Sequence, residues 1–318
     1  MKKLVSLLLA AVMVLALTAC GNTGSAGDGY TVGICQLAQH EALDAATEGF
    51  KTALTDKLGD KVTVYEQNAS GDSSTCSTIC NQFVADNVDL IMANATPALL
   101  AASAATGTIP IVGTSISHYG TALEIENWSG VTGLNITGTS DLAPMDQQAA
   151  IIPELFPDAK KVAVLYCSAE PNSVYQSDVI TAEFDKLGLE YEIFTFADSN
   201  DIASVVTNAC AACDIIYIPT DNTAATCAET INNVAQPAGV PIVGGDAGIC
   251  RGCGVATIGI SYYDIGYAAG EMAARILTEG TDPATMEIEF APKFEKVYNP
   301  DICAALGITV PSDYVPVG

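Results

Sequence analysis

The sequence predicts an α/β protein of two lobes, each a Rossmann-like, doubly wound parallel sheet, joined by a three-segment hinge. From Tyr30 onward, short apolar and β-branched segments alternate with helical segments, which is typical of parallel strands covered on both faces. After "VTGLNITGTSDL" the alternation starts again, so the series occurs twice. The chain has 318 residues, of which 49% are hydrophobic, and this suffices for two cores.

The expected elements follow the same order in both series. In the first, we expect strands at 30–37, 61–67, 90–95 and 110–115, and helices at 42–58, 73–87 and 97–106. In the second, we expect strands at 162–167, 190–196, 215–219 and 241–245, and helices near 142–156, 172–187, 200–212, 223–236 and 263–277.

Three extended segments fit neither series, and we expect the chain to cross between the lobes there: 131–137, 255–260 and 286–299. The predicted N-terminal lobe is 30–137 together with part of the C-terminal segment, about 286–318. The predicted C-terminal lobe is 138–285.

The N-terminal segment 1–20 has the pattern of a secretory signal peptide. Two lysines precede an apolar run at 4–17, which is shorter than the roughly 20 residues that a membrane span needs. The following "LTAC" resembles the bacterial lipobox, which predicts that Cys20 is lipidated and that 21–29 is a flexible tether. We therefore expect a lipid-anchored protein at the extracytoplasmic face of the cell membrane. The alternative is an ordinary signal peptide with a cysteine there by chance.

The charge balance excludes several partners. With 12 basic and 37 acidic residues the formal charge is −25, and without the two lysines of the signal segment it is about −27. Such a surface repels nucleic acid and anionic headgroups, so we expect no nucleic-acid partner and membrane attachment through the lipid alone.

The eleven cysteines leave more than one interpretation open. Cys210 and Cys213, like Cys250 and Cys253, have the C-x-x-C spacing of zinc or iron–sulfur ligands. The alternatives are a local disulfide or redox pair, or thiols that pack as small hydrophobic side chains. We favour thiols and expect no metal and no cofactor.

Small polar loops follow most predicted strands. They are "QLAQHEALD", "NASGDSS", "ANATPAL", "GTSISHYG", "CSAEPNS", "PTDNTAA" and "GGDAGI". In doubly wound sheets, ligands bind beside the carboxyl ends of the strands, and helix starts there favour an anionic group. Two such edges facing each other across a hinge predict a binding cleft.

Several of these segments also carry a resemblance. In order, they are "VGICQLAQHEALDAATEGF", "VYEQNASGDSSTC", "VDLIMANATPAL", "KKVAVLYCSAEPNS", "DIIYIPTDNT" and "ISYYDIGYAAGEMAARIL". Together they resemble the ABC-transporter substrate-binding lipoproteins of the type I periplasmic-binding-protein fold, in particular the branch for tryptophan, tyrosine and phenylalanine uptake. The resemblance extends over 30–310 and implies a permease and its ATPase as partners. Glu41 departs from it, because family members commonly have proline after the loop histidine.

A free amino acid brings an ammonium and a carboxylate, and burying either without a partner costs several kcal/mol. Hydroxyls at helix starts suit the carboxylate, and the first-lobe candidates are Thr96 and Ser115. The ammonium needs acceptors, and the second-lobe candidates are Glu170, Asp221 and Asp246. Each of these side chains has a plainer alternative as a helix cap or turn former.

Other loop residues complete the expected site. Asn172, Ser173 and Asn222 can orient either charged group, and His40 is expected to be a binding-loop histidine. A catalytic role for His40 is not expected, since the chain has no serine elbow, metal-binding histidine pair or phosphate-binding glycine loop. Its alternative is a surface or capping role.

Four aromatic residues lie within reach of the predicted cleft, although aromatics near strand ends are usually core: Tyr119, Trp128, Tyr166 and Tyr175. We expect the solute-binding component of an ABC importer that captures a small solute, most simply an aromatic amino acid, by hinge closure, and no enzyme. The alternatives are a ligand sensor for a signalling receptor, a binder of a sugar or nucleoside, and an exported enzyme or redox protein that uses the cysteine pairs.

Overall fold

The computed structural model describes residues 29–317. The predicted signal peptide 1–20, the lipidation of Cys20 and all but the last residue of the tether 21–29 lie outside these residues. Within 29–317, no helix combines the length and the apolar character that crossing a membrane requires.

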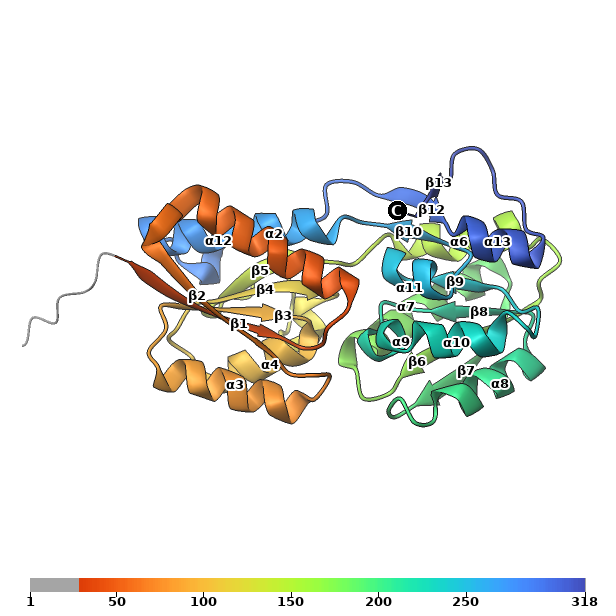
Figure 1. Cartoon of the computed structure of the whole chain (residues 1–318), viewed down its shortest axis with the longest axis horizontal. Helices are drawn as coiled ribbons and strands as arrows, with labels where there is room; N and C mark the ends of the chain where they lie inside the picture. Colours follow the sequence, from red (N-terminus) through yellow and green to blue (C-terminus); the bar gives the residue numbers. More distant parts are fainter. Residues whose placement is uncertain (1–28, 318) are drawn as a thin grey trace, which may run out of the picture.

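The first lobe contains a parallel sheet in the order β11-β5-β4-β3-β1-β2. Its strands are β1 (Tyr30–Gln36), β2 (Val62–Asn68), β3 (Leu90–Asn94), β4 (Ile111–Ile116), β5 (Ile136–Ser140) and β11 (Glu289–Phe290). The helices are α2 (Glu41–Leu58), η1 (Gly59–Lys61), α3 (Ser73–Ala85), α4 (Thr96–Ala105), α5 (Tyr119–Ala122), α12 (Tyr262–Glu279) and η2 (Pro283–Thr285). In Figure 1, α3 and α4 cover one face and α2 and α12 the other, and each pair buries its own apolar cluster.

The second lobe contains a sheet in the order β13-β12-β10-β9-β8-β6-β7, parallel except where β10 pairs with β12. Its strands are β6 (Lys161–Cys167), β7 (Glu190–Phe196), β8 (Ile215–Ile218), β9 (Ile242–Gly244), β10 (Ala256–Gly259), β12 (Glu295–Tyr298) and β13 (Val315–Pro316). The helices of one face are α6 (Met145–Leu155), α7 (Pro171–Leu187) and α13 (Pro300–Leu306). Those of the other are α8 (Ile202–Ala212), α9 (Asn222–Thr226), α10 (Ala228–Ala235) and α11 (Ala247–Gly252).

Both sheets have the same winding, in which the strand order reverses between β1 and β3 and between β6 and β8. The predicted fold class, two doubly wound parallel-sheet lobes, is therefore confirmed. The predicted helix 223–236 is interrupted at Cys227, where α9 ends and α10 begins.

The chain passes between the lobes at 141–144, 260–261 and 291–294. Two segments expected to be crossings, 131–137 and 255–260, instead contribute to strands β5 and β10 of the two sheets. The crossings follow these strands directly.

The predicted lobe boundaries are wrong at two places. Helix α12 lies within the predicted C-terminal lobe 138–285 but packs along α2 in the first lobe, where its apolar side joins Phe50 and Leu54. The chain from 295 onward was assigned to the first lobe, but β12, α13 and β13 belong to the second. The spacing of apolar residues along a helix shows which of its sides is buried. It does not show which of the two sheets the helix packs against.

Candidate ligand-binding site between the lobes

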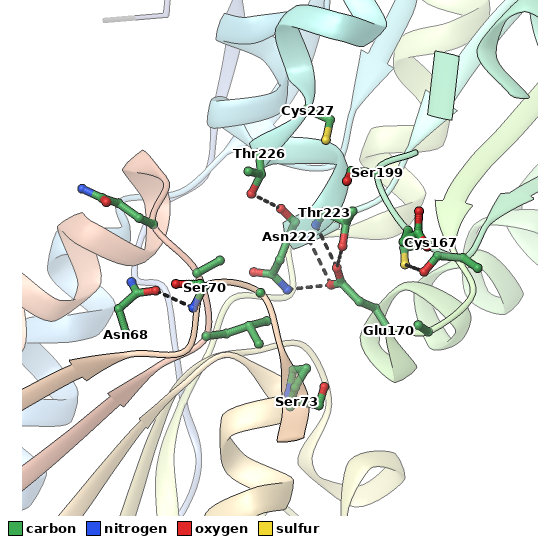
Figure 2. Close-up of a pocket in the computed structure, with 18 residues that line it drawn as sticks. Asn68, Ser70, Ser73, Cys167, Glu170, Ser199, Asn222, Thr223, Thr226 and Cys227 are labelled. Atoms are coloured by element: carbon green, nitrogen blue, oxygen red, sulfur yellow. Dashed lines mark hydrogen bonds between the residues drawn. The ribbon is translucent and has the colours of Figure 1, made fainter. Parts of the chain in front are cut away.

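The carboxyl ends of the strands in the two sheets face each other across the gap between the lobes. A small inner cavity lies there, lined from both sides by His40, Leu43, Ser115, Asp141, Asn172, Thr220, Asp221, Asn222, Ala225, Asp246 and Tyr262. Beside it lies a second small hollow at Thr96, His118 and Tyr175. An outer pocket of about 540 Å³ opens next to it, around Leu37, Pro97, Glu170 and Thr223 (Figure 2).

Eight of the nine binding residues predicted from the sequence line these pockets. His40, Ser115, Asn172, Asp221, Asn222 and Asp246 line the inner cavity. Thr96 lines the neighbouring hollow, and Glu170 lines the outer pocket. Ser173 is fully buried and accepts a hydrogen bond from the Asn172 amide, so it supports a lining residue.

Three polar atoms of the cleft lack a hydrogen-bond partner although they are buried. Among the described residues, the buried unpartnered atoms are Thr96 Oγ1, Ser115 Oγ, Asn172 Oδ1 and, away from these pockets, Asn94 Oδ1. A buried polar group without a partner costs about 1–3 kcal/mol. Two hydroxyls from the first lobe and an amide oxygen from the second are therefore available to a bound ligand.

The first-lobe side of the cleft also contains strained backbone. Ala95 has φ 85° and Ser115 has φ 57°, and both are non-glycine residues in the left-handed region. Such positions cost about 1–3 kcal/mol and occur most often at binding sites. The unusual turn at Ala95 starts helix α4, so Thr96 and the positive end of the helix lie together at the cleft.

Glu170 is held by the protein itself. Its Oε2 accepts from the backbone N–H and Nδ2 of Asn222 at 3.0 and 2.7 Å and from Nδ2 of Asn172 at 3.2 Å. Its Oε1 accepts from the backbone N–H and hydroxyl of Thr223 at 2.8 and 2.7 Å (Figure 2). The carboxylate thus fixes the start of α9 and orients two amides of the inner cavity.

The two aspartates predicted at the second-lobe strand ends, Asp221 and Asp246, differ in the hydrogen bonds that they accept from the protein. Asp221 accepts from the backbone N–H groups of Ala224 and Cys167, both at 2.7 Å, so both of its oxygens have a partner. Burial, with the nearby charge of Glu170, raises the pKa of Asp221 to about 8. Asp246 caps α11 through one oxygen, which accepts from Ile249 N–H at 2.9 Å. Burial also raises the pKa of Asp246.

Sequence reasoning missed Asp141, a buried acid of the inner cavity. It follows β5 at the first crossing and accepts from the hydroxyls of Ser117 and Tyr262, each at 3.1 Å. Burial raises the pKa of Asp141 to about 6. Asp141 follows "NITGTS" much as Asp221 follows "IIYIPT". The strand-end rule would have found it if 131–137 had been interpreted as the start of a strand.

Contacts between the lobes close over the cavity. His40 Nε2 lies 3.2 Å from Asn222 Oδ1, and Gln176 Nε2 donates to Ser117 Oγ at 2.8 Å. Arg251 of the second lobe also pairs with Glu41, the residue that departs from the family pattern. Polar groups from both lobes therefore meet directly around the cavity.

The aromatic residues divide between core and cleft. His118 of the first lobe stacks on Tyr175 of the second, with ring centroids 4.7 Å apart, and Trp128 approaches His118 edge-on. Tyr119 is buried and donates to Thr139 O, and Tyr166 packs against the second core. Tyr175 and Trp128 are therefore the aromatic candidates that lie near the cleft.

The family described as "ABC transporter substrate binding protein" matches residues 31–315. The chain belongs to this family. Members of this family are the substrate-binding components of ABC transporters, and their role is to bind a solute.

Relatives of this substrate-binding protein include a tyrosine-binding protein of Clostridioides difficile (strain R20291), 32% identical over an alignment 323 residues long that covers 96% of this chain and 92% of the relative. A Streptococcus pneumonia structure in complex with L-Trp has 32% identity and a TM-score of 0.85, over 89% of this chain and 96% of that one. A ligand-free, open structure of a substrate-binding protein with adhesive properties from Clostridium difficile has 31% identity and a TM-score of 0.69, over 91% and 100%.

The lobes of this substrate-binding protein are arranged more like those of the L-Trp complex than like those of the ligand-free, open structure. The two structural relatives are equally distant in sequence, yet the L-Trp complex superposes with a TM-score of 0.85 and the open structure with 0.69. The interlobe hydrogen bonds of His40 and Gln176 agree with this. The distances in the cleft are therefore those of two lobes in direct contact.

The cysteines of the substrate-binding protein lie mostly in the cores. All ten described cysteines are free thiols, and no group of three or more Cys, His, Asp or Glu within 29–317 is arranged to hold a metal ion. Burial raises the pKa of Cys250 and of Cys253 far above the usual thiol range. A protonated, enclosed thiol is a poor nucleophile, so this pair lacks the properties of a redox site.

Proposed function

We propose that this substrate-binding protein captures an aromatic amino acid between its lobes and delivers it to a membrane permease that an ATPase drives. The observation that carries the proposal is that buried, unpartnered hydroxyls of one lobe and an unpartnered amide oxygen of the other line two neighbouring hollows between the lobes. A zwitterion needs both kinds of partner at once, and the residues around these hollows supply both.

The carboxylate of the ligand accepts from the hydroxyls of Thr96 and Ser115, which have no other partner. The start of α4 adds a favourable dipole for a negative charge. This arrangement explains how the site holds an anion without lysine or arginine among the described lining residues.

The ammonium of the ligand donates to Asn172 Oδ1 and to Asp246. The Asn172 amide is fixed by donating to Glu170, Ser173 and Thr220, so its oxygen is directed away from them. Glu170 and Asp221 do not contact the ligand directly. Their oxygens already accept hydrogen bonds from the protein, and they position the residues that contact it.

The aromatic ring of the ligand occupies the outer pocket. Leu37, Ala38, Pro97 and Ala169 give this pocket apolar walls, and its volume of about 540 Å³ exceeds that of a single ring. The names of two relatives support an aromatic ligand, since one is called tyrosine-binding and another has L-Trp bound.

Attachment to the membrane belongs to the same proposal. A signal peptide at 1–20 and a lipid on Cys20 would tether the protein at the extracytoplasmic face, where the solute arrives.

The test is calorimetric titration of the purified protein with L-tyrosine, L-tryptophan and L-phenylalanine, with L-leucine, a sugar and a nucleoside as comparisons. We expect the aromatic amino acids to bind most tightly. Ser115→Ala and Thr96→Val should each weaken binding about 10- to 100-fold, because each removes a donor to a charged group worth about 1.5–3 kcal/mol. Thr55→Val, at an exposed position of α2, is the matched control. Tighter binding of the sugar or nucleoside would refute the ligand assignment and leave the fold untouched.

A further inference from the structure

The inner cavity is lined by more acidic than basic side chains. Asp141, Asp221 and Asp246 line it and are 5%, 1% and 5% exposed. The only basic side chain among the described lining residues is His40. A ligand that enters therefore meets several carboxylates enclosed by protein.

These carboxylates differ in the donors that they accept from. Asp221 accepts one backbone N–H on each oxygen, and the backbone fixes both donors. Asp141 also accepts one hydrogen bond on each oxygen, but from the hydroxyls of Ser117 and Tyr262, whose hydrogens can rotate, and a carboxylate has about four acceptor positions. Asp141 therefore retains acceptor positions within the cavity. A second, independent acceptor is Asn172 Oδ1, which is buried and unpartnered.

Lobe closure increases the cost of this charge. Gln176 of the second lobe reaches Ser117, and Ser117 in turn donates to Asp141, so the closed lobes cover the acid. Burial raises the pKa of Asp141 to about 6 and also raises that of Asp246. A ligand cation offsets the buried negative charge, whereas a ligand carboxylate adds to it.

We propose that the cationic amine is the part of the ligand that the closed cavity requires, that Asp141 is a further residue that binds it, and that the site also takes aromatic monoamines without a carboxylate. This rests on the proposed function, because it concerns the same cavity. The hydroxyls of Thr96 and Ser115 then bind water in place of the carboxylate.

The experiment measures dissociation constants at pH 7.5 for L-tyrosine and for two analogues that each lack one of its charges. Tyramine keeps the ammonium, and 3-(4-hydroxyphenyl)propionate keeps the carboxylate. We expect tyramine to bind at least 30-fold more tightly than the propionate. Equal affinities, tighter binding of the propionate, or no detectable binding of tyramine overturns the inference. If L-tyrosine and L-tryptophan both fail to bind, the proposed function fails, and tyramine still tests the amine requirement by itself.

Asp141→Asn tests the residue. It should weaken tyramine binding at least 10-fold and leave binding of the propionate unchanged or improve it. The ratio of the two dissociation constants, propionate over tyramine, should therefore decrease. A purely structural role would weaken both ligands alike, and that result contradicts the role of Asp141. Asp86→Asn, an exposed acid at the end of α3, is the control and should leave the preference unchanged. Circular dichroism checks folding, and if Asp141→Asn does not fold, Asp141→Glu, which moves the carboxylate by one methylene, replaces it with the same expected narrowing.

Discussion

At the scale of single residues, the acids of the cleft have separate tasks although they share one environment. Glu170 and Asp221 organise the start of α9 and have their oxygens occupied. Asp141 accepts as many hydrogen bonds as Asp221, but from the hydroxyls of Ser117 and Tyr262, and Asp246 accepts from Ile249 N–H through one oxygen; both line the same cavity. The distinction rests on which donors bind each acid, and the sequence gives the acids without their partners.

The raised pKa of Asp141 predicts opposite pH trends for the free and the ligand-bound protein. Its pKa is about 6 in the folded chain against about 3.8 in the unfolded chain, so folding favours the protonated acid. This stabilisation is complete below pH 4 and is lost as the pH rises through 6, by on the order of 3 kcal/mol. The melting temperature of the free protein should therefore fall as the pH rises from 4 to 6. The melting temperature of Asp141→Asn should depend less on pH over this range.

The stabilisation by L-tyrosine should grow over the same pH range, because the ammonium binds the ionised acids. The melting-temperature increase caused by the ligand is thus expected to be larger at pH 7.5 than at pH 5. An increase that is equal at both pH values would show that no buried acid contacts the ammonium.

At the scale of elements, the packing of α2 against α12 decides which lobe contains α12. A Cβ on Gly266 would overlap the backbone carbonyl of Ala46, and one on Gly49 would overlap that of Tyr263. The two glycines therefore allow the helices to approach closely across the first sheet. The sequence predicted the helix, but the matching of two glycines more than 200 residues apart appears only in the fold.

This contact gives a prediction for Gly266→Ala. The added methyl group forces α12 away from α2, and overpacking of this kind costs about 1–3 kcal/mol. Urea denaturation should give that loss in the free energy of unfolding. Gly107→Ala, where a Cβ would meet no atom within 4 Å, should lose nothing. Equal stabilities of the two variants would mean that the helices can separate without cost.

At the scale of the whole molecule, ligand affinity includes the free energy of closing the lobes. The closed form is held by contacts such as the Gln176–Ser117 hydrogen bond, which join residues of different lobes. A ligand that contacts both lobes shifts the equilibrium toward the closed form by its differential affinity.

Ser117→Ala should therefore weaken ligand binding about 3- to 10-fold, since it removes an interlobe hydrogen bond worth about 0.5–1.5 kcal/mol. Small-angle scattering should show a smaller radius of gyration on adding L-tyrosine to the unmodified protein, and a higher ligand concentration needed for the same change in the variant. Ser204→Ala, at an exposed position of α8, is the control. A radius that does not change with ligand would contradict closure.

The sequence by itself determined the two-lobe α/β fold and the strand-end loops, and it predicted many of the polar residues at the cleft but not Asp141. These depend on local periodicity and on the rule that the carboxyl ends of parallel strands share an edge. Only the tertiary structure decided that α12 covers the first sheet, that Asp141 joins the cavity through Tyr262, 121 residues away, and that Glu170 is already occupied. Such contacts join distant parts of the chain, and no local pattern specifies their partners.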